Sequence, residues 1–279
     1  MRRITTFLTA SFLAATVSIA PAQAATFETS VPESYGINDP SCVSDVEPVV
    51  LIHGTSDNSS AWTDLIPRLQ EQNMCVWAFD YGADDVTLQN AIPAMKAIGD
   101  LDASAREIAE QIEYVRSATG SDKVNLVGHS QGGLHTKTFT QLYGSPEEVS
   151  RVVAIGGNYH GTTLSGMGPA LSDIAKVMPK LAAFLGTTAG IQQLQGSDFI
   201  EKMNKLPDTA PGVKYTSIYS PADTTVTPNE TSKLTAVPGA DVENVSLGDV
   251  CENPAAHPDL PHDSCTLDQV MWGLSLIHI

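Results

Sequence analysis

The chain has little positive charge: its 279 residues include 15 lysines and arginines against 32 aspartates and glutamates, a formal net charge of −17. It contains no basic patch, no zinc-knuckle pattern and no glycine-rich phosphate loop. Nucleic acids and nucleotides are therefore not expected as partners, because cationic side chains and such loops hold these ligands. The acidity favours solubility outside a cell and repels anionic lipid headgroups, unless an apolar patch makes the contact.

Long apolar runs are also scarce, and the one at the N-terminus is too short for a spanning helix. Arg2 and Arg3 precede the apolar residues 7–20, and Ala22-Gln23-Ala24 has the small-residue pattern of a cleavage site. We interpret residues 1–24 as a secretory signal, with a membrane anchor as the alternative. The mature protein is then expected to be secreted, without stable membrane insertion. Its 13 lysines and arginines against 32 acidic residues give a net charge of −19.

Cysteine is limited to four residues, without a Cys-x-x-Cys pair that would suggest a metal site. In an exported chain, four cysteines are expected to form two disulfides, for which three pairings are possible. We expect the local pairing, Cys42 with Cys75 and Cys251 with Cys265. The second bond would close a loop that contains His257. Neither a metal nor another cofactor is expected.

The last six residues, 274–279, read as the translation of a common sequencing-adapter DNA. We expect them to be an artefact, with a natural apolar tail as the alternative, and we exclude His278 from every candidate site. The remaining residues, 25–273, have the length of one α/β domain.

The most informative motif is Gly128-His129-Ser130-Gln131-Gly132, which joins an apolar segment at 123–127 to a helical pattern at 133–143. A serine in a G-x-S-x-G turn between a strand and a helix is typical of the nucleophile in the α/β-hydrolase fold. The turn is sharp, so the positions two before and two after Ser130 must lack bulk. The alternative is a glycine-rich turn whose serine caps the helix.

Apolar segments alternate with helical patterns, which predicts a mostly parallel central sheet flanked by helices on both faces. The expected strands are 46–52, 74–79, 123–127, 151–155, 213–219 and 242–247, and the expected helices include 61–72, 104–118 and 133–143. Residues from about 164 to 205 interrupt this alternation, because they are apolar, near-helical in spacing and interrupted by glycines. We expect a helical cap or lid there, and two ordinary packed helices remain the alternative.

In the α/β-hydrolase fold, an acid and then a histidine follow the nucleophile along the chain. Asp223 comes after the expected strand 213–219 and is the predicted acid. Glu230 is a weaker candidate, and an Asx-turn is the alternative role for Asp223. The base is expected after the last strand, where both His257 and His262 lie, and position alone does not separate them. A metal site at this histidine pair is disfavoured, because such loops usually supply too few ligands.

Attack of a serine on an acyl group produces a tetrahedral oxyanion, which backbone N–H groups stabilise. The first expected donor is Gln131, directly after the candidate nucleophile. The second is Thr55, in the loop after the first core strand, whose hydroxyl is a further candidate donor. A simple turn residue is the alternative for Thr55, and His53 beside it is interpreted as structural.

These motifs resemble those of the secreted actinobacterial lipases and esterases of the class-2 lipase family. The resemblance spans nearly all of the mature chain. It rests on the segments 48–62, 75–82, 128–133, 196–199, 215–216, 223–228 and 249–251. In that family the base stands in a pattern like H-x-x-L-P-x-D, and residues 257–263 match it with His257 as the base. The resemblance also supports Ser130 and Asp223 in the triad, and Thr55 and Gln131 as oxyanion donors.

The residues and the resemblance together predict an exported, monomeric serine hydrolase of the lipase and esterase type, which needs no cofactor. Acylglycerols or similar acyl esters are the expected substrates, some of them at a lipid–water interface. Acyl transfer to an alcohol by the same triad is one alternative. A catalytically silent, surface-binding protein on the same scaffold is another.

Overall fold

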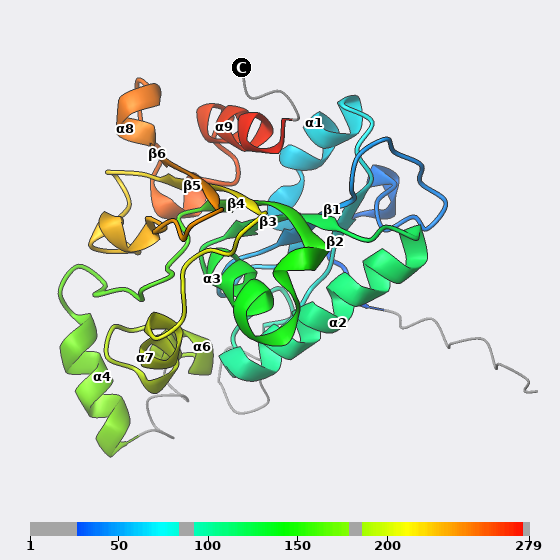
Figure 1. The fold of residues 1–279 in the computed structure, drawn as a ribbon. Helices are drawn as coiled ribbons and strands as arrows, with labels where there is room; N and C mark the ends of the chain where they lie inside the picture. Colours follow the sequence, from blue (N-terminus) through cyan, green and yellow to red (C-terminus); the bar gives the residue numbers. More distant parts are fainter. Residues whose placement is uncertain (1–26, 84–91, 179–185, 276–279) are drawn as a thin grey trace, which may run out of the picture.

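The structure of the protein is a computed structural model that describes residues 27–83, 92–178 and 186–275 (Figure 1). The expected signal segment 1–24 and His278 lie outside the described residues, as do residues 179–185 of the expected cap. Within the described ranges, no helix is both long enough and apolar enough to cross a membrane.

A parallel sheet forms the centre of the molecule, and the described residues contribute six strands to it in the order β2-β1-β3-β4-β5-β6. Each neighbouring pair runs parallel. The strands are β1 (Val49–Ile52), β2 (Val76–Ala78), β3 (Val124–His129), β4 (Val149–Ile155), β5 (Lys214–Tyr219) and β6 (Asp241–Ser246). The predicted strands are therefore confirmed, with ends that shift by a few residues.

Helices cover both faces of this sheet (Figure 1). One face carries α1 (Leu65–Glu71) and α9 (Ser264–Leu274), and the other carries α2 (Leu101–Thr119) and α3 (Gln131–Thr138). The remaining described α-helices are α4 (Gly168–Val177), α6 (Thr188–Gln192), α7 (Asp198–Asn204) and α8 (Leu247–Val250).

The pleat of β1 shows how the sequence supplies both cores. Val49 and Leu51 join the cluster with α1 and α9, whereas Val50 and Ile52 join the cluster with α2. Successive strand residues point to opposite faces, so a strand covered on both sides must be apolar at every position. All four residues of β1 are buried, which explains why its sequence is a continuous apolar run rather than an alternating one.

The strand order makes the loops after β1 and β3 diverge. β1 lies between β2 and β3. After β1 the chain adds β2 on one side of it, and the later strands, β3 to β6, are added on the other side. In open parallel sheets, a crevice forms at the carboxyl ends of the strands where this reversal occurs. Thr55 follows β1 and Ser130 follows β3, so both lie at the reversal point.

The helix predicted at 61–72 is shorter than expected. Residues Ser59–Trp62 form a separate 3₁₀ turn, capped by the Asn58 side chain, and α1 begins only at Leu65. A helix begun at residue 61 would place Pro67 in its interior, where its missing N–H would break the hydrogen-bond ladder. Starting at Leu65 puts this proline in the first turn, where no N–H is required.

A buried ion pair joins α3 to the loop before β5. The Lys137 ammonium lies 2.8 Å from Asp208 Oδ1, and their side chains are only 1% and 8% exposed. Thr235 N donates to Asp208 Oδ2 at 3.0 Å, and His160 Nε2 lies 3.4 Å from the same oxygen. Burial opposes ionisation of Asp208, but the contacts with His160 and Lys137 outweigh it and hold the pKa of this carboxyl well below its usual range.

Asp208→Asn is expected to lower the free energy of unfolding by about 3–5 kcal/mol, because it leaves the Lys137 charge buried without a partner. Urea denaturation at pH 7 measures this. Since folding lowers the pKa of Asp208, the contribution of its carboxylate to the stability of the fold is fully present above the ordinary carboxyl pKa of about 4 and is lost as the pH falls further. The variant should lack this contribution to the pH dependence of unfolding.

The matched control is Asp102→Asn, which breaks the Lys202–Asp102 pair, whose side chains are 40% and 41% exposed. That loss should stay below about 1 kcal/mol. Equal losses in the two variants would contradict the importance of the buried pair.

Candidate functional site

The G-x-S-x-G motif forms the turn between β3 and α3. Ser130 adopts φ 54° and ψ −120°, a left-handed backbone conformation that residues other than glycine rarely adopt. A Cβ added at Gly128 would lie 2.5 Å from the backbone of Gly132, and one at Gly132 would lie 2.0 Å from the carbonyl oxygen of Ile52. The predicted reason for the two glycines, a turn without room for bulk, is therefore confirmed. Backbone strain of this kind concentrates at functional sites.

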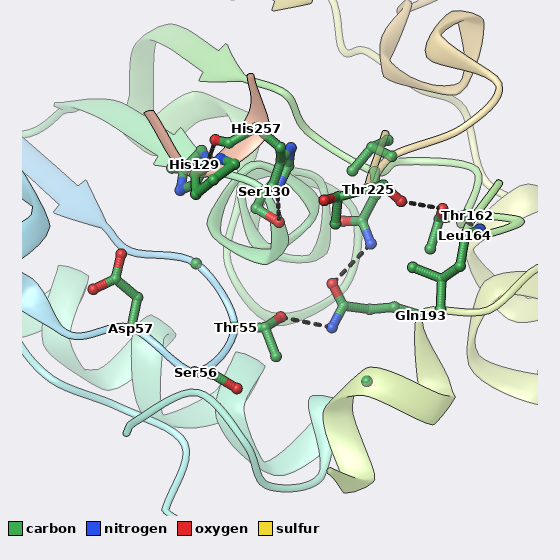
Figure 2. A pocket seen from close by; sticks show the side chains of 15 residues that line it. Thr55, Ser56, Asp57, His129, Ser130, Thr162, Leu164, Gln193, Thr225 and His257 are labelled. Carbon is green, nitrogen blue, oxygen red and sulfur yellow. Dashed lines mark hydrogen bonds between the residues drawn. The ribbon is translucent and has the colours of Figure 1, made fainter. Parts of the chain in front are cut away.

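Three side chains from remote parts of the chain meet at this turn. His257 Nε2 lies 2.9 Å from Ser130 Oγ (Figure 2), and His257 Nδ1 lies 2.6 Å from Asp223 Oδ2. Asp223 comes from the loop after β5, and His257 begins a short 3₁₀ turn after α8. All three residues are buried. The structure thus brings together the serine, acid and histidine that the sequence analysis singles out.

The hydrogen bonds determine which histidine nitrogen carries the proton. A carboxylate only accepts, so His257 Nδ1–H donates to Asp223 Oδ2. In the neutral ring Nε2 is then an acceptor, and the Ser130 hydroxyl donates to it. The other carboxylate oxygen, Asp223 Oδ1, accepts from the N–H groups of Thr225 and Val226 at 2.7 and 2.8 Å. Asp223 is therefore both fixed in orientation and hydrogen-bonded on each oxygen.

The rival residues lie elsewhere. His262 Nδ1 pairs with Asp64 Oδ2 at 2.7 Å, with both side chains about half exposed at the surface. Glu230 lies exposed in a 3₁₀ turn, Asn229–Ser232. The geometry therefore agrees with the choice of Asp223 over Glu230, and it favours His257 over His262, which their positions in the sequence alone do not separate.

His129, the residue before Ser130, supports the histidine of the site. Its ring lies 4.9 Å from the His257 ring, between centroids, and its Nε2 lies 3.1 Å from the backbone oxygen of His257. Burial, followed by the repulsion of His257, lowers the pKa of His129 well below its ordinary value. The ring is therefore neutral, and it donates from Nε2 to that backbone oxygen. Sequence reasoning missed this contact; its only signal is the position of His129 inside the motif.

The two expected oxyanion donors lie on neighbouring loops. Gln131 is the first residue of α3, so its N–H has no partner within the helix. Thr55 lies in the loop after β1, beside the same cavity. The Thr55 hydroxyl, a further candidate donor, is hydrogen-bonded in this state, because Thr55 Oγ1 donates its only hydrogen to Gln131 Oε1 at 2.7 Å.

His53 is buried next to this loop and packs against Tyr81, with ring centroids 4.4 Å apart. The Tyr81 hydroxyl donates to the His53 backbone oxygen at 2.7 Å. Burial lowers the pKa of His53, so its ring is held neutral. These contacts agree with the structural role expected of His53.

A cavity of about 380 Å³ opens beside Ser130 and His257 (Figure 2). Its walls include the apolar side chains of Leu164, Val226 and Pro258. Uncharged polar groups contributed by loops on several sides complete it: Thr55, Ser56, Asn158, Thr162, Gln193 and Thr225. Asp57 is the carboxylate in the lining. Asn158, Thr162 and Gln193 were not singled out from the sequence, since isolated polar residues in loops carry no recognisable pattern.

The stem of the expected cap is hydrogen-bonded to the loop that carries Asp223. Thr162 Oγ1 donates to the Thr225 backbone oxygen at 2.5 Å, and Thr163 N donates to that of Thr227 at 2.7 Å. The chain returns from α6 to pair with its own outgoing stem, where Thr162 and Leu194 form an isolated parallel bridge. The segment between them is therefore closed at its base, next to the acid. Whether it moves as a lid stays a prediction.

Both expected disulfides are present: Cys42 with Cys75, and Cys251 with Cys265. The second closes the loop that contains His257, as the sequence predicted. Ser220 Oγ also donates to the Ala255 backbone oxygen at 2.6 Å, which ties this loop to the end of β5. The histidine of the site is thus held by a covalent link on one side and a hydrogen bond on the other.

Comparison with known proteins gives a consistent result. A family model described as the alpha/beta hydrolase fold matches residues 47–205. A triacylglycerol lipase of Pseudomonas fragi is 32% identical over 74 residues, which are 26% of this chain and 25% of that lipase. A triacylglycerol lipase of Pseudarthrobacter phenanthrenivorans is 33% identical over 73 residues, 26% of this chain and 21% of that one. The chain therefore matches about a quarter or less of the length of these curated relatives.

Solved structures show the same fold at low sequence identity. Lipase B of Aspergillus fumigatus superimposes with a TM-score of 0.61 and 21% identity, over 79% of this chain and 50% of that chain. The lin2722 gene product of Listeria innocua gives a TM-score of 0.55 and 17% identity, over 84% of this chain and 96% of that chain. The predicted α/β-hydrolase fold is thereby confirmed, while similarity at this level carries no information on substrates.

Proposed function

We propose, given that the chain belongs to the alpha/beta hydrolase fold family, that the protein is an exported serine carboxylester hydrolase of the lipase and esterase type. One observation carries the proposal: Ser130, His257 and Asp223 form a continuous hydrogen-bonded array at the wall of a cavity. Serine followed by a histidine and a buried carboxylate is an arrangement that activates a hydroxyl for acyl transfer.

The proposed reaction follows from these positions. Ser130 Oγ attacks the ester carbonyl carbon while His257 Nε2 accepts the hydroxyl proton, and Asp223 stabilises the imidazolium that results. The oxyanion receives hydrogen bonds from the N–H groups of Thr55 and Gln131. His257 then gives its proton to the departing alcohol oxygen, which leaves the acyl group on Ser130. A water molecule deprotonated by His257 releases the acid and restores the serine.

Neutral acyl esters suit this cavity. Apolar and uncharged polar side chains line it together with the carboxylate of Asp57, which would repel an anionic substrate. The two relatives described as triacylglycerol lipases support acylglycerols as the substrate class. The two disulfides and the expected signal segment support action outside the cell, where such bonds persist.

A hydrolysis assay tests this proposal. Purified protein is offered 4-nitrophenyl esters of increasing acyl length and emulsified tributyrin, with release of nitrophenol or acid as the readout. We expect turnover of esters in either set and an acyl-enzyme detectable by mass spectrometry on Ser130 after rapid quenching. Absence of turnover across both substrate sets would contradict the proposal. A dominant alkyl ester product with added alcohol would redirect it to acyl transfer by the same residues.

A further inference from the structure

Gln193, at the end of α6, is hydrogen-bonded to both residues that are expected to supply oxyanion donors. It is 5% exposed. Its Nε2 lies 2.8 Å from Thr55 Oγ1, 3.0 Å from Gln131 Oε1 and 3.0 Å from the Ala189 backbone oxygen. Its Oε1 accepts from Asn158 Nδ2 at 2.7 Å. Figure 2 shows the Thr55 and Gln193 side chains pointing toward each other, with a dashed line marking their hydrogen bond.

His135 determines the orientation of the Gln131 amide, and with it the direction of the hydrogen bond between Gln131 and Thr55. The Thr138 hydroxyl donates to the His135 backbone oxygen at 2.9 Å, so His135 Nδ1–H donates to Thr138 Oγ1 at 3.2 Å. Burial lowers the pKa of His135 to about 3, so the ring is neutral and its Nε2 accepts. Gln131 Nε2 donates to that nitrogen at 3.3 Å. Gln131 Oε1 therefore faces Thr55 and accepts the hydrogen of its hydroxyl.

This arrangement poses a problem for oxyanion stabilisation. The Thr55 hydroxyl has one hydrogen, and it is donated to Gln131 Oε1. Turning that hydrogen toward an oxyanion would normally leave a buried amide oxygen without a donor, which is unfavourable. Gln193 Nε2 removes the difficulty, because it already lies within hydrogen-bond distance of both Gln131 Oε1 and the Thr55 hydroxyl oxygen.

We propose that Gln193 is a positioning residue for oxyanion stabilisation. Its amide holds the hydroxyl oxygen of Thr55 in place, and it keeps Gln131 Oε1 hydrogen-bonded while the Thr55 hydrogen turns to the oxyanion. This inference rests on the proposed esterase function. It links α6, within the expected cap, to the chemical step, and it predicts an effect on kcat that a purely structural glutamine would not produce.

The first test is Gln193→Met, which keeps the length of the side chain and removes both donors. On a soluble 4-nitrophenyl ester we expect kcat to fall about 10- to 100-fold with KM nearly unchanged, since losing a direct oxyanion donor costs about 10²–10³-fold in kcat. The inhibition constant of an alkyl boronic acid, which forms a tetrahedral adduct with the serine, should rise in parallel.

The neighbouring glutamine provides a matched control. Gln192 Nε2 donates to Asp100 Oδ2 at 2.7 Å, and its Oε1 accepts from Leu101 N at 2.7 Å. Gln192→Met therefore loosens α6 from the start of α2 without touching the oxyanion loop. It should lower Tm while kcat stays within about twofold of the unmodified protein, as expected for loss of structural hydrogen bonds alone.

A double-mutant cycle with Thr55→Val separates the two roles. If Gln193 acts through the Thr55 hydroxyl, Gln193→Met should cost less than about threefold in kcat once that hydroxyl is absent. Full additivity, or a Gln193→Met variant that matches Gln192→Met in kcat, would overturn the inference while leaving an active esterase. Wild-type turnover by Ser130→Ala would instead overturn the proposed function itself.

Discussion

Ser130→Ala is expected to lower kcat for ester hydrolysis by about 10⁴-fold or more, because it removes the hydroxyl that forms the acyl-enzyme. Folding should be almost unaffected, since the Ser130 hydroxyl makes a single described hydrogen bond, to His257 Nε2. Initial rates on a 4-nitrophenyl ester measure the loss, and thermal unfolding measures stability. A fluorophosphonate probe should label the unmodified protein and not the variant.

Ser104→Ala is a suitable control for this experiment. Ser104 is also a buried serine, on α2, and its Oγ has no hydrogen-bond partner among the described residues. Its replacement should leave both turnover and labelling within about twofold of the unmodified protein, in keeping with a change that removes no described interaction. Retained activity or labelling in Ser130→Ala would refute Ser130 as the nucleophile.

His257→Ala should lower kcat by about 10³-fold or more, because it removes the imidazole that is placed to accept the Ser130 proton. His262→Ala should change kcat by less than about twofold, since this ring pairs with Asp64 at the surface and such pairs contribute about 0–1 kcal/mol. The two histidines share one loop, so the pair of variants controls for loop disturbance. Steady-state kinetics on one soluble ester is sufficient.

The reverse order of damage would move the base to His262 and contradict the geometry. A similar loss in both variants would indicate that the loop as a whole, rather than one imidazole, limits turnover. Thermal unfolding of both variants separates these outcomes. If disturbance of the loop lowers kcat equally in both variants, Tm should also fall equally in both.

Much of the architecture could be predicted because it depends on local patterns. The apolar run at Val49–Ile52 predicted a strand covered on both faces, and the structure buries each of its residues. The motif around Ser130 predicted a sharp turn, since glycine is needed wherever two backbone segments approach closely. The start of α1 was placed too early, at residue 61, because the effect of Pro67 was not considered: α1 begins at Leu65, which keeps this proline in the first turn.

The contacts of single polar groups could not be predicted in the same way. The sequence made the Thr55 hydroxyl a candidate donor, but it could not indicate that the side chain of Gln131 accepts its hydrogen. Gln193 carried no signal in the sequence, since it belongs to no recognisable motif. The direction of a hydrogen bond depends on every neighbour that competes for the same atoms, and those neighbours come from distant segments.

The sequence by itself determined the alternation of strands and helices and the sharp turn that carries Ser130, and it favoured the local pairing of the four cysteines. These features follow from side-chain periodicity, backbone sterics and chain distance, which neighbouring residues specify. The family resemblance favoured His257 as the base, but only the tertiary structure showed that His257 contacts Ser130 while His262 pairs with Asp64, and that Gln193 contacts Thr55. The physical reason is that parallel strands end at one edge of the sheet, where loops far apart in the chain converge and compete for the same few hydrogen bonds.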